Sequence, residues 1–201
     1  MTLNDRSSLL SLLESRRSGR PREMVAPGPS PAELERILAI AARTPDHGKL
    51  FPWRFVVIED GQRDALAALL RQALPEADPA ATQAHYDKAE EFARQGAALV
   101  VLVSAPIDNH KIPLWEQQLS CGAAGMNLLL AAHAMGFVGG WLTGWAVYSE
   151  RVRAAFCGPG ERLAGFLFLG SPGAELSERP RAPLATVVRP WVPPADGVKA
   201  E

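Results

Sequence analysis

The stretch LSCGAAGMNLLLAAHAM (residues 119–135) decides the fold, because it is apolar on nearly every side over the length of a long helix. A helix without a polar face is buried in the interior of a protein. Its Gly and Ala residues allow another helix to approach closely. The sequence that follows, GFVGGWLTGW (residues 136–145), contains glycines that permit tight turns or contact with a flat ligand. We therefore predict a central buried helix between Trp115 and Met135, followed by a ligand-contacting loop.

The same stretch approaches the roughly 20 residues that a helix needs to cross a bilayer. Ser120, Asn127 and His133 interrupt it, however, and it is richer in Gly and Ala than in Leu and Ile. Its flanks also lack the basic clusters that orient membrane helices. These features favour a buried helix of a globular protein over a transmembrane helix.

Length and charge limit the classes of protein to be considered. The 201 residues suffice for one domain, or one compact subunit of an oligomer, with a substantial core. The net charge of −1 provides no basic stripe for binding nucleic acid. Cys121 and Cys157 are far apart and indicate neither a disulfide framework nor a zinc site. Because no secretory segment is recognised either, a cytoplasmic location is favoured.

The N-terminal half is expected to contain two helices, an extended connector and a strand. Leucines at helical spacing predict a first helix over 9–18 that ends at Gly19. Four prolines make 20–31 an extended connector. The next helix starts with a capping box at residues 30–33, and 54–59 has the composition of a strand.

The C-terminal half is expected to contain further strands and helices, with no internal repeat. Residues 75–95 are predicted to form a polar helical pair of the kind found in lids. Continuous apolar runs predict strands over 97–103 and 165–170, and Ser149 caps a short helix over 149–156. The Pro-rich tail, about 171–201, cannot form a core, so it either lies across a partner subunit or is disordered.

Two groups of polar residues are candidates for a role in binding or catalysis. Arg16 and Arg17 close the first predicted helix, where the helix dipole favours cations and where they would also clamp a phosphate or a ring edge. Asp46, His47 and Lys49 lie in a loop between two prolines. The alternative interpretation is that the loop is an ordinary solvated turn before a strand. The residue types alone leave both alternatives open in each case.

Familiar nucleotide-binding and hydrolase motifs are missing. No GxGxxG follows a strand, and the sequence contains neither a P-loop nor a GxSxG elbow. The four histidines lack the spacing of a helical metal site, and His133 is expected to be a satisfied core residue. The arginines, the Asp-His loop and the Trp-bearing glycine stretch would suit a flat, anionic, aromatic cofactor such as flavin mononucleotide (FMN).

Seven segments occur in the order and approximate spacing of one known family. On these segments the chain resembles the nitroreductase family, most closely its small YdjA-like branch. The resemblance spans about Leu9 to Pro190, so a single domain is expected over 1–201. The segments are RRS (16–18), RxPDH (43–47), PW (52–53), NHK (109–111), WEQ (115–117), GWLTG (140–144) and GFLFLGSP (165–172).

The resemblance implies an α+β, nitroreductase-like fold in which helices flank a central mixed or antiparallel sheet. It also implies an intertwined homodimer that forms through the central helices and binds two FMN molecules at its interface. Each flavin would lie between the arginines of one subunit and the tryptophan-bearing bend of its partner. The implied cofactor-binding residues are Arg16, Arg17, Ser18, Arg43, His47, Trp141, Leu142 and Thr143, with a looser match at Lys49, Gly140, Arg179 and Arg181.

The family also suggests a role for each segment. The segment matching Arg16–Ser18 holds the flavin phosphate and ring edge, and the one matching 141–143 lies along the isoalloxazine and offers backbone groups to N5. This chain departs from many members, which carry SxxNxQPW where it has DHGKLFPW (46–53). Phe51 therefore replaces a polar residue, which leaves the substrate open.

The expected function is that of an FMN-dependent NAD(P)H oxidoreductase working by a ping-pong mechanism. Hydride would pass through flavin N5 to a nitroaromatic, quinone or similar acceptor. Arg43, with Arg16 or Arg17, would stabilise the reduced flavin, and His47 would bond to the cofactor or substrate. Three alternatives stay open: other flavin chemistry such as dehydrogenation or oxygen-dependent cleavage, a non-catalytic FMN-binding dimer, or a metal-dependent hydrolase using Asp46 and His47.

Overall fold

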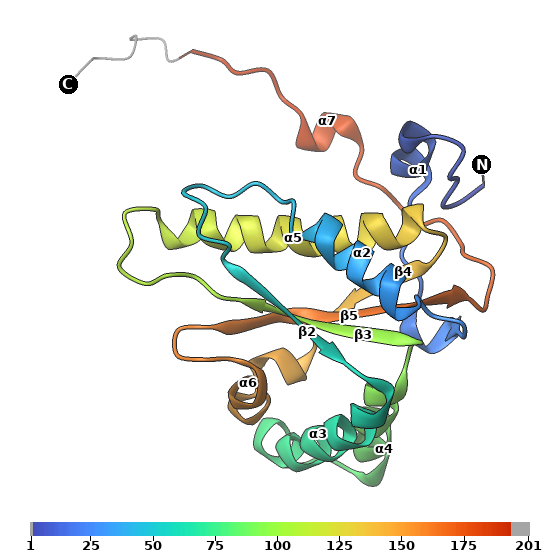
Figure 1. Cartoon of the computed structure of the whole chain (residues 1–201), viewed down its shortest axis with the longest axis vertical. Helices are drawn as coiled ribbons and strands as arrows, with labels where there is room; N and C mark the ends of the chain where they lie inside the picture. Colours follow the sequence, from blue (N-terminus) through green and yellow to red (C-terminus); the bar gives the residue numbers. More distant parts are fainter. Residues whose placement is uncertain (1, 194–201) are drawn as a thin grey trace.

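In a computed structural model, which describes residues 2–193, helices cover both faces of a five-stranded sheet (Figure 1). One face carries the longest helix together with a shorter one, and the other face carries three helices. These layers confirm the predicted α+β fold class. The first face is covered by α2 (Pro31–Ala41) and α5 (Leu114–Ala134), and the second by α3 (Arg63–Ala77), α4 (Gln83–Arg94) and α6 (Glu150–Phe156).

Every pair of neighbouring strands in the sheet is antiparallel. The longest strand, β5, lies at the centre, with β3 and then β2 on one side. On its other side β5 pairs with β4, and its C-terminal end pairs with β1. The strands are β1 (Met24–Val25), β2 (Trp53–Ile58), β3 (Ala98–Ser104), β4 (Val138–Leu142) and β5 (Arg162–Pro172).

The side chains of the two central strands divide the core into two halves. Because successive side chains point to opposite faces, Phe166 and Phe168 of β5 lie against α3 and α4. Leu167 and Leu169 lie against α2 and α5. Phe92 of α4 contacts both phenylalanines edge to face, at centroid distances of 5.2 and 5.1 Å. The predicted buried strands are therefore confirmed, and both faces of each are covered.

The central helix α5 confirms the prediction made from its apolar sequence. Its polar interruptions have partners, since Asn127 Nδ2 donates to Thr44 Oγ1 at 2.7 Å. Gly125 admits the sheet rather than another helix: a β-carbon there would lie 2.6 Å from the Trp141 ring and 2.7 Å from Leu102. Among the described residues, none of the helices is both long enough and apolar enough to cross a membrane.

Two predictions near the glycines were wrong. The first helix, α1 (Leu9–Ser15), ends before the arginines, and Gly19 does not terminate it because its N–H instead donates to Gly139 O at 3.1 Å. Residues 136–145 are not all loop, since β4 occupies 138–142. Glycine allows this strand to lie close to α5: a β-carbon at Gly139 would be 2.6 Å from the Leu129 side chain.

Several other predicted elements are present with changed boundaries. The capping box at Ser30 and Glu33 is present, and Ser149 caps α6. Within 75–95 only α4 is a separate helix, because α3 continues through Pro75 to Ala77. Short helical turns add η1 (Pro21–Glu23), η2 (Asp60–Gln62), η3 (Trp145–Tyr148) and, in a tail that extends away from the sheet in Figure 1, α7 (Leu184–Val187).

Candidate functional site

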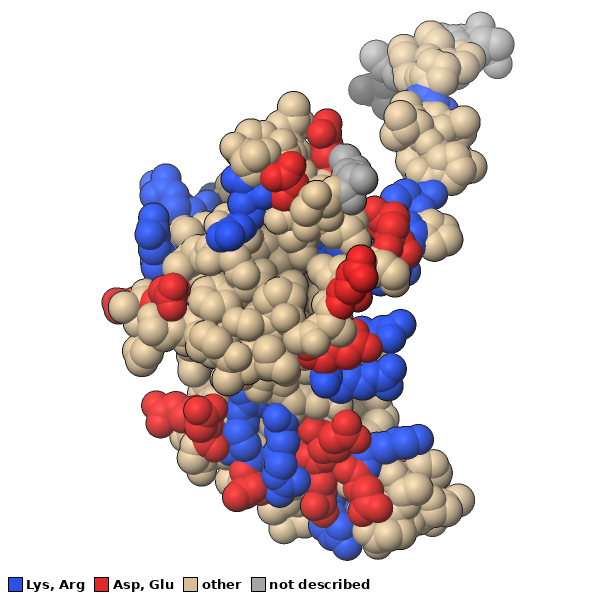
Figure 2. All heavy atoms as spheres, turned by 90° about the vertical axis from the view of Figure 1, so that its right-hand side faces the viewer, with Lys and Arg blue, Asp and Glu red and all other residues tan. Residues whose placement is uncertain are grey.

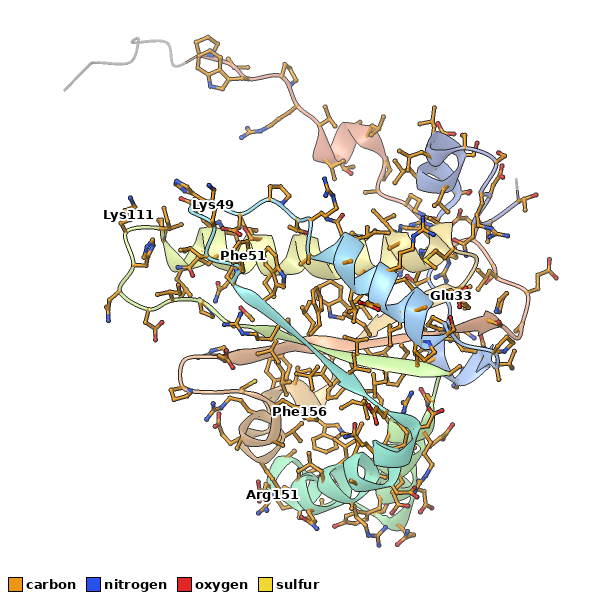
Figure 3. All side chains as sticks on the ribbon, viewed as in Figure 1. Glu33, Lys49, Phe51, Lys111, Arg151 and Phe156 are labelled. Carbon is orange, nitrogen blue, oxygen red and sulfur yellow. The ribbon has the colours of Figure 1, made fainter. Side chains whose placement is uncertain are left out.

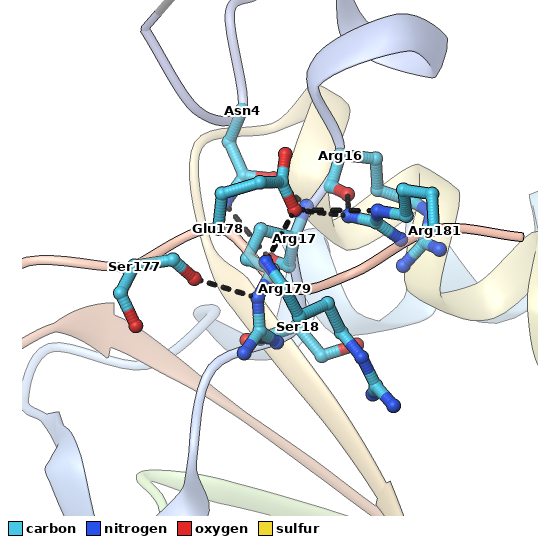
Figure 4. Close-up of polar contacts among 8 residues, drawn as sticks. All are labelled: Asn4, Arg16, Arg17, Ser18, Ser177, Glu178, Arg179 and Arg181. Carbon is cyan, nitrogen blue, oxygen red and sulfur yellow. Dashed lines mark hydrogen bonds and ion pairs between the residues drawn. The ribbon is translucent and has the colours of Figure 1, made fainter. Parts of the chain in front are cut away.

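Arg16, Arg17 and Ser18 form an extended segment directly after α1. Arg16 leaves the helix with ψ of 129°, so the segment runs on towards the sheet. The side chain of Asn4 holds its backbone in place, since Arg17 N donates to Asn4 Oδ1 at 2.8 Å and Asn4 Nδ2 donates to Arg17 O at 3.1 Å (Figure 4). The N-terminal arm thus fixes the course of the arginine segment.

The C-terminal tail brings two further arginines to this segment. Arg181 Nη2 donates to Arg16 O at 3.0 Å, and Arg17 Nε donates to Ser177 O at 2.9 Å. Arg179 lies in the same group (Figure 4). We call the set Arg16, Arg17, Arg179 and Arg181 the arginine corner. Its two halves come from opposite ends of the chain.

Positive charge in the arginine corner exceeds negative charge. Burial lowers the pKa of the half-buried Arg16, and the neighbouring Arg181 and Arg17 lower it further. In the described part of the chain the Arg16 guanidinium has neither a hydrogen bond nor an ion pair, and Glu178 is the acid paired with Arg181. Acidic and basic side chains are interspersed on the face drawn in Figure 2. The corner is therefore suited to binding an anion.

The exposed edge of β4 lies beside the arginine corner. Gly139 turns its backbone outwards: its C=O accepts from Gly19 N, and its N–H donates to His133 Nε2 at 3.2 Å. Antiparallel pairing alternates, so the N–H and C=O of Trp141 also point away from β5, whereas those of Leu142 point towards Phe166. At Trp141 the strand edge thus presents a donor and an acceptor that pair with no other strand among the described residues.

The side chain of Trp141 does not face this edge. Its Nε1 donates to Ala164 O at 3.0 Å, and its ring packs against Gly125. Gly140 lies close to the arginine segment, because a β-carbon there would be 2.8 Å from Gly19 O. Thr143 follows β4 directly and is exposed. The indole of Trp141 is therefore held against α5 and β5, and only its backbone lies at the strand edge.

His133 connects α5 to the β4 edge. Its side chain is fully buried, and burial, followed by the charge of Arg16, lowers its pKa to about 4. The neutral ring accepts at Nε2, as described above. Its Nδ1 has no partner within residues 2–193, so the prediction of a satisfied core histidine holds for one ring nitrogen and is wrong for the other.

The second predicted group lies in the loop before β2. Asp46 organises this loop, because its carboxylate accepts from Leu50 N at 2.7 Å and from Phe51 N at 3.2 Å. Lys49 and Phe51 have positive φ of 58° and 50°, which is strained backbone for such residues. His47 Nδ1 lies 2.7 Å from Glu116 Oε2 of α5.

The two groups lie at opposite ends of α5. Glu116 and His133 are separated by about 25 Å along the helix axis, and Lys49 and Phe51 are near Lys111 at the N-terminal end (Figure 3). Within one chain the structure therefore joins Arg16–Ser18 to the edge of β4 and leaves His47 apart, whereas Thr44, the neighbour of Arg43, bonds Asn127 in the middle of α5. This differs from the expectation that the tryptophan-bearing bend reaches the arginines from the partner subunit.

Several residues of the site were not found from the sequence. Asn4, Ser177 and Glu178 contact the arginine corner, but an isolated polar residue in a terminal segment carries no motif. Arg179 and Arg181 were matched loosely and are now placed beside Arg16. In the part of the chain that the structure describes, no group of three or more His, Cys, Asp or Glu is arranged to hold a metal ion.

The chain is similar to known proteins in both sequence and fold. A model of the Nitroreductase family matches residues 13–171. Two proteins named "Putative NAD(P)H nitroreductase" are similar: YdjA of Escherichia coli is 37% identical over 84% of this chain and 90% of its own length, and a Haemophilus influenzae protein is 40% identical over 85% and 91%. The structure of the NADPH:FMN oxidoreductase of Vibrio harveyi in complex with NAD+ superimposes with a TM-score of 0.69 at 17% identity, covering 90% of this chain and 76% of that one.

Proposed function

The chain belongs to the nitroreductase family, and on that basis we propose that it is an FMN-dependent oxidoreductase that takes electrons from NAD(P)H. The names of its relatives and of the structurally similar Vibrio harveyi enzyme support this cofactor and this donor. When bound, FMN would supply the redox chemistry, taking hydride from the nicotinamide and reducing a nitroaromatic, quinone or similar acceptor. The protein's own task is to hold and orient the cofactor.

The arginine corner fits the phosphate of FMN. Guanidinium groups match phosphate oxygens in planar, charge-assisted pairs. Arg16 is half-buried, is repelled by Arg17 and Arg181, and has no acceptor in the described residues, so an arriving dianion would relieve its unfavourable position. Arg16, Arg17, Arg179 and Arg181 are therefore assigned to the phosphate, and Ser18 to the adjoining part of the cofactor.

The edge of β4 fits the rim of the isoalloxazine. Trp141 has a backbone N–H and C=O that point outwards, and Thr143 lies exposed just beyond it. Flavin rings carry both donors and acceptors on one rim, so an unused strand edge is complementary to them. Gly140 would allow the ring to approach, and Leu142 would support the edge from below, since it packs against the core beside α3 and α4.

A second copy of the chain would complete the site. The exposed side of α5 is an apolar stripe at helical spacing, a feature typical of an interface rather than of a solvated face. Two such helices packed antiparallel would bring the partner's Arg43, the partner's His47 and the partner's Lys49 towards the arginine corner. The partner's Arg43 would then help to stabilise negative charge on the reduced ring. The stripe consists of Trp115, Leu119, Ala123, Met126, Leu130 and Ala134.

The charge-unbalanced arginine corner beside the open edge of β4 is the observation that carries this proposal. An absorbance spectrum of the purified full chain, before and after anaerobic addition of NADH or NADPH, tests it. We expect a flavin spectrum that one of the donors bleaches and that a nitroaromatic or quinone restores. A protein that neither carries nor takes up FMN would refute the proposal.

The same experiment separates the alternatives. Bound FMN that neither NADH nor NADPH reduces would indicate a non-catalytic flavin-binding dimer. Flavin that is reduced but reacts with oxygen alone would indicate a different flavin reaction. Metal that remains in the purified protein while flavin does not bind would point to the hydrolase alternative at Asp46 and His47.

A further inference from the structure

One acidic residue occupies the arginine corner from within the chain. Glu178 Oε1 accepts three hydrogen bonds: from Arg181 Nη2 at 2.9 Å, from Arg181 Nε at 3.2 Å and from Arg179 N at 2.8 Å (Figure 4). The backbone N–H of Arg179, and then the side chain of Arg181, lower the pKa of this carboxyl group. Glu178 is therefore a carboxylate bound to donors of Arg179 and Arg181, two members of the corner.

The donors that Glu178 uses are those that a phosphate would use. The Nε and Nη2 edge of a guanidinium binds one anion in a planar pair, so a carboxylate and a phosphate cannot both occupy it in that geometry. The guanidinium groups of Arg16 and Arg179 have no acceptor within residues 2–193. Arg181 is thus the member of the corner whose fork is already neutralised by a side chain.

Glu178 also helps to hold the two halves of the corner together, through Arg181. Burial lowers the pKa of Arg16 most, and repulsion by Arg181 and Arg17 lowers it further. An internal carboxylate offsets this repulsion and keeps the tail beside Arg16 through the bond from Arg181 Nη2 to Arg16 O. Glu178 therefore keeps the arginines of the corner together, but it also competes with an incoming anion for Arg181.

We propose that Glu178 is an internal anion that occupies the Arg181 fork until a phosphate monoester displaces it, and that this competition weakens the binding of phosphate at the corner. The identity of that monoester as FMN rests on the proposed function. The competition acts on the phosphate end of the cofactor alone. It should therefore leave the affinity for riboflavin, which lacks the phosphate, unchanged.

The test compares Glu178→Gln with the matched control Glu175→Gln. Both substitutions remove one negative charge from the same segment, but Glu175 has no ion pair in the described part of the chain. Dissociation constants of FMN and riboflavin are measured by the quenching of flavin fluorescence on the flavin-free full chain. We expect Glu178→Gln to lower the dissociation constant of FMN about tenfold and to leave that of riboflavin within about twofold. Glu175→Gln should change neither by more than about twofold.

A second readout uses inorganic phosphate at constant ionic strength. The phosphate concentration that raises the melting temperature should fall about tenfold in Glu178→Gln and remain unchanged in Glu175→Gln. Weaker binding of FMN by Glu178→Gln, or equal effects of the two variants, would overturn the inference. A wild-type protein that responds to phosphate but binds neither flavin would refute the proposed function and leave the role of Glu178 to be decided by the phosphate series.

Discussion

The ring of Trp141 on β4 lies against the backbone of Gly125 on α5, so closely that a β-carbon at residue 125 would come within 2.6 Å of it. The indole is held there by the bond from Nε1 to Ala164 O. This contact fixes the strand whose outer edge lies beside the arginine corner. The packing of one helical glycine is thus tied to the position of the candidate flavin site.

Substituting Gly125 should therefore strain the site. We expect Gly125→Ala to lower the free energy of unfolding by about 1–3 kcal/mol, because the methyl group overpacks the core, and to weaken FMN binding. Gly122→Ala on the same helix is the matched control, since a β-carbon there has nothing within 4 Å. Urea unfolding and flavin titration measure both effects. Equal stability of the two variants would contradict the packing argument.

Arg16 should contribute to the binding of FMN but not to the stability of the flavin-free chain. Because its charge is partly desolvated and repelled by Arg17 and Arg181, Arg16→Gln in the flavin-free chain should be at least as stable as the wild type. Its affinity for FMN should fall about tenfold or more, with riboflavin unaffected. Arg162→Gln, at an exposed position at the start of β5, serves as the control for net charge. Loss of stability in Arg16→Gln would show that the charge is compensated.

His133 should make the protein sensitive to acid. Its pKa is about 4 in the folded chain and near 6.5 when unfolded, so below pH 6.5 the unfolded chain binds a proton that the folded chain does not. Stability should fall as the pH drops from 6.5 towards 4, by about 2 kcal/mol at pH 5. In His133→Gln this loss should be absent, whereas the exposed His85→Gln should retain it. The midpoints of urea unfolding, measured between pH 7.5 and pH 5, check this. If His133→Gln loses as much stability at low pH as the wild type, the prediction is wrong.

Arg63 should stabilise the packing of α3 against α4. Its buried guanidinium donates through Nη1 to Ala93 O at 3.0 Å and Gln95 O at 3.2 Å, carbonyls at the C-terminal end of α4. We expect Arg63→Leu to cost about 2 kcal/mol in the free energy of unfolding, because those acceptors lose a charged donor. Arg71→Leu, which removes an exposed ion pair with Glu90 on the same helix pair, should cost less than about 1 kcal/mol. Chemical unfolding of both variants would test the ranking.

The apolar stripe of α5 should hold two chains together. Leu119, near the N-terminal end of the stripe, is 53% exposed, and a carboxylate there would be buried without a partner in a dimer. We expect Leu119→Glu to be monomeric in sedimentation experiments and to lose FMN. Tyr148→Glu on η3, at a position that is 82% exposed, should remain a flavin-binding dimer. A folded Leu119→Glu dimer would place the interface elsewhere.

Local sequence patterns were sufficient for the elements that are stabilised by their neighbours in the chain. The apolar run of α5, the capping box at Ser30 and the buried strand β3 each follow from residues within a few positions of one another. The ordered motifs were also enough to identify the nitroreductase family. In these cases the helix caps, the periodicity and the hydrophobic burial all favour the same structure.

The sequence alone could not decide which residues meet. It placed Arg16 and Arg17 at the end of a helix, whereas Asn4 and Gly139 bind the segment in an extended form. The glycines of β4 were interpreted as a loop, because glycine is unfavourable in strands unless another element must approach closely.

By itself, then, the sequence determined the layers of the fold, the family and the residue types of the site. Only the tertiary structure decided that Arg181 lies beside Arg16, 165 positions away, that Glu178 already occupies the Arg181 fork, and that His47 lies at the other end of α5. The reason is physical: helices and strands are specified by local interactions, whereas a binding site depends on long-range packing that brings distant segments together.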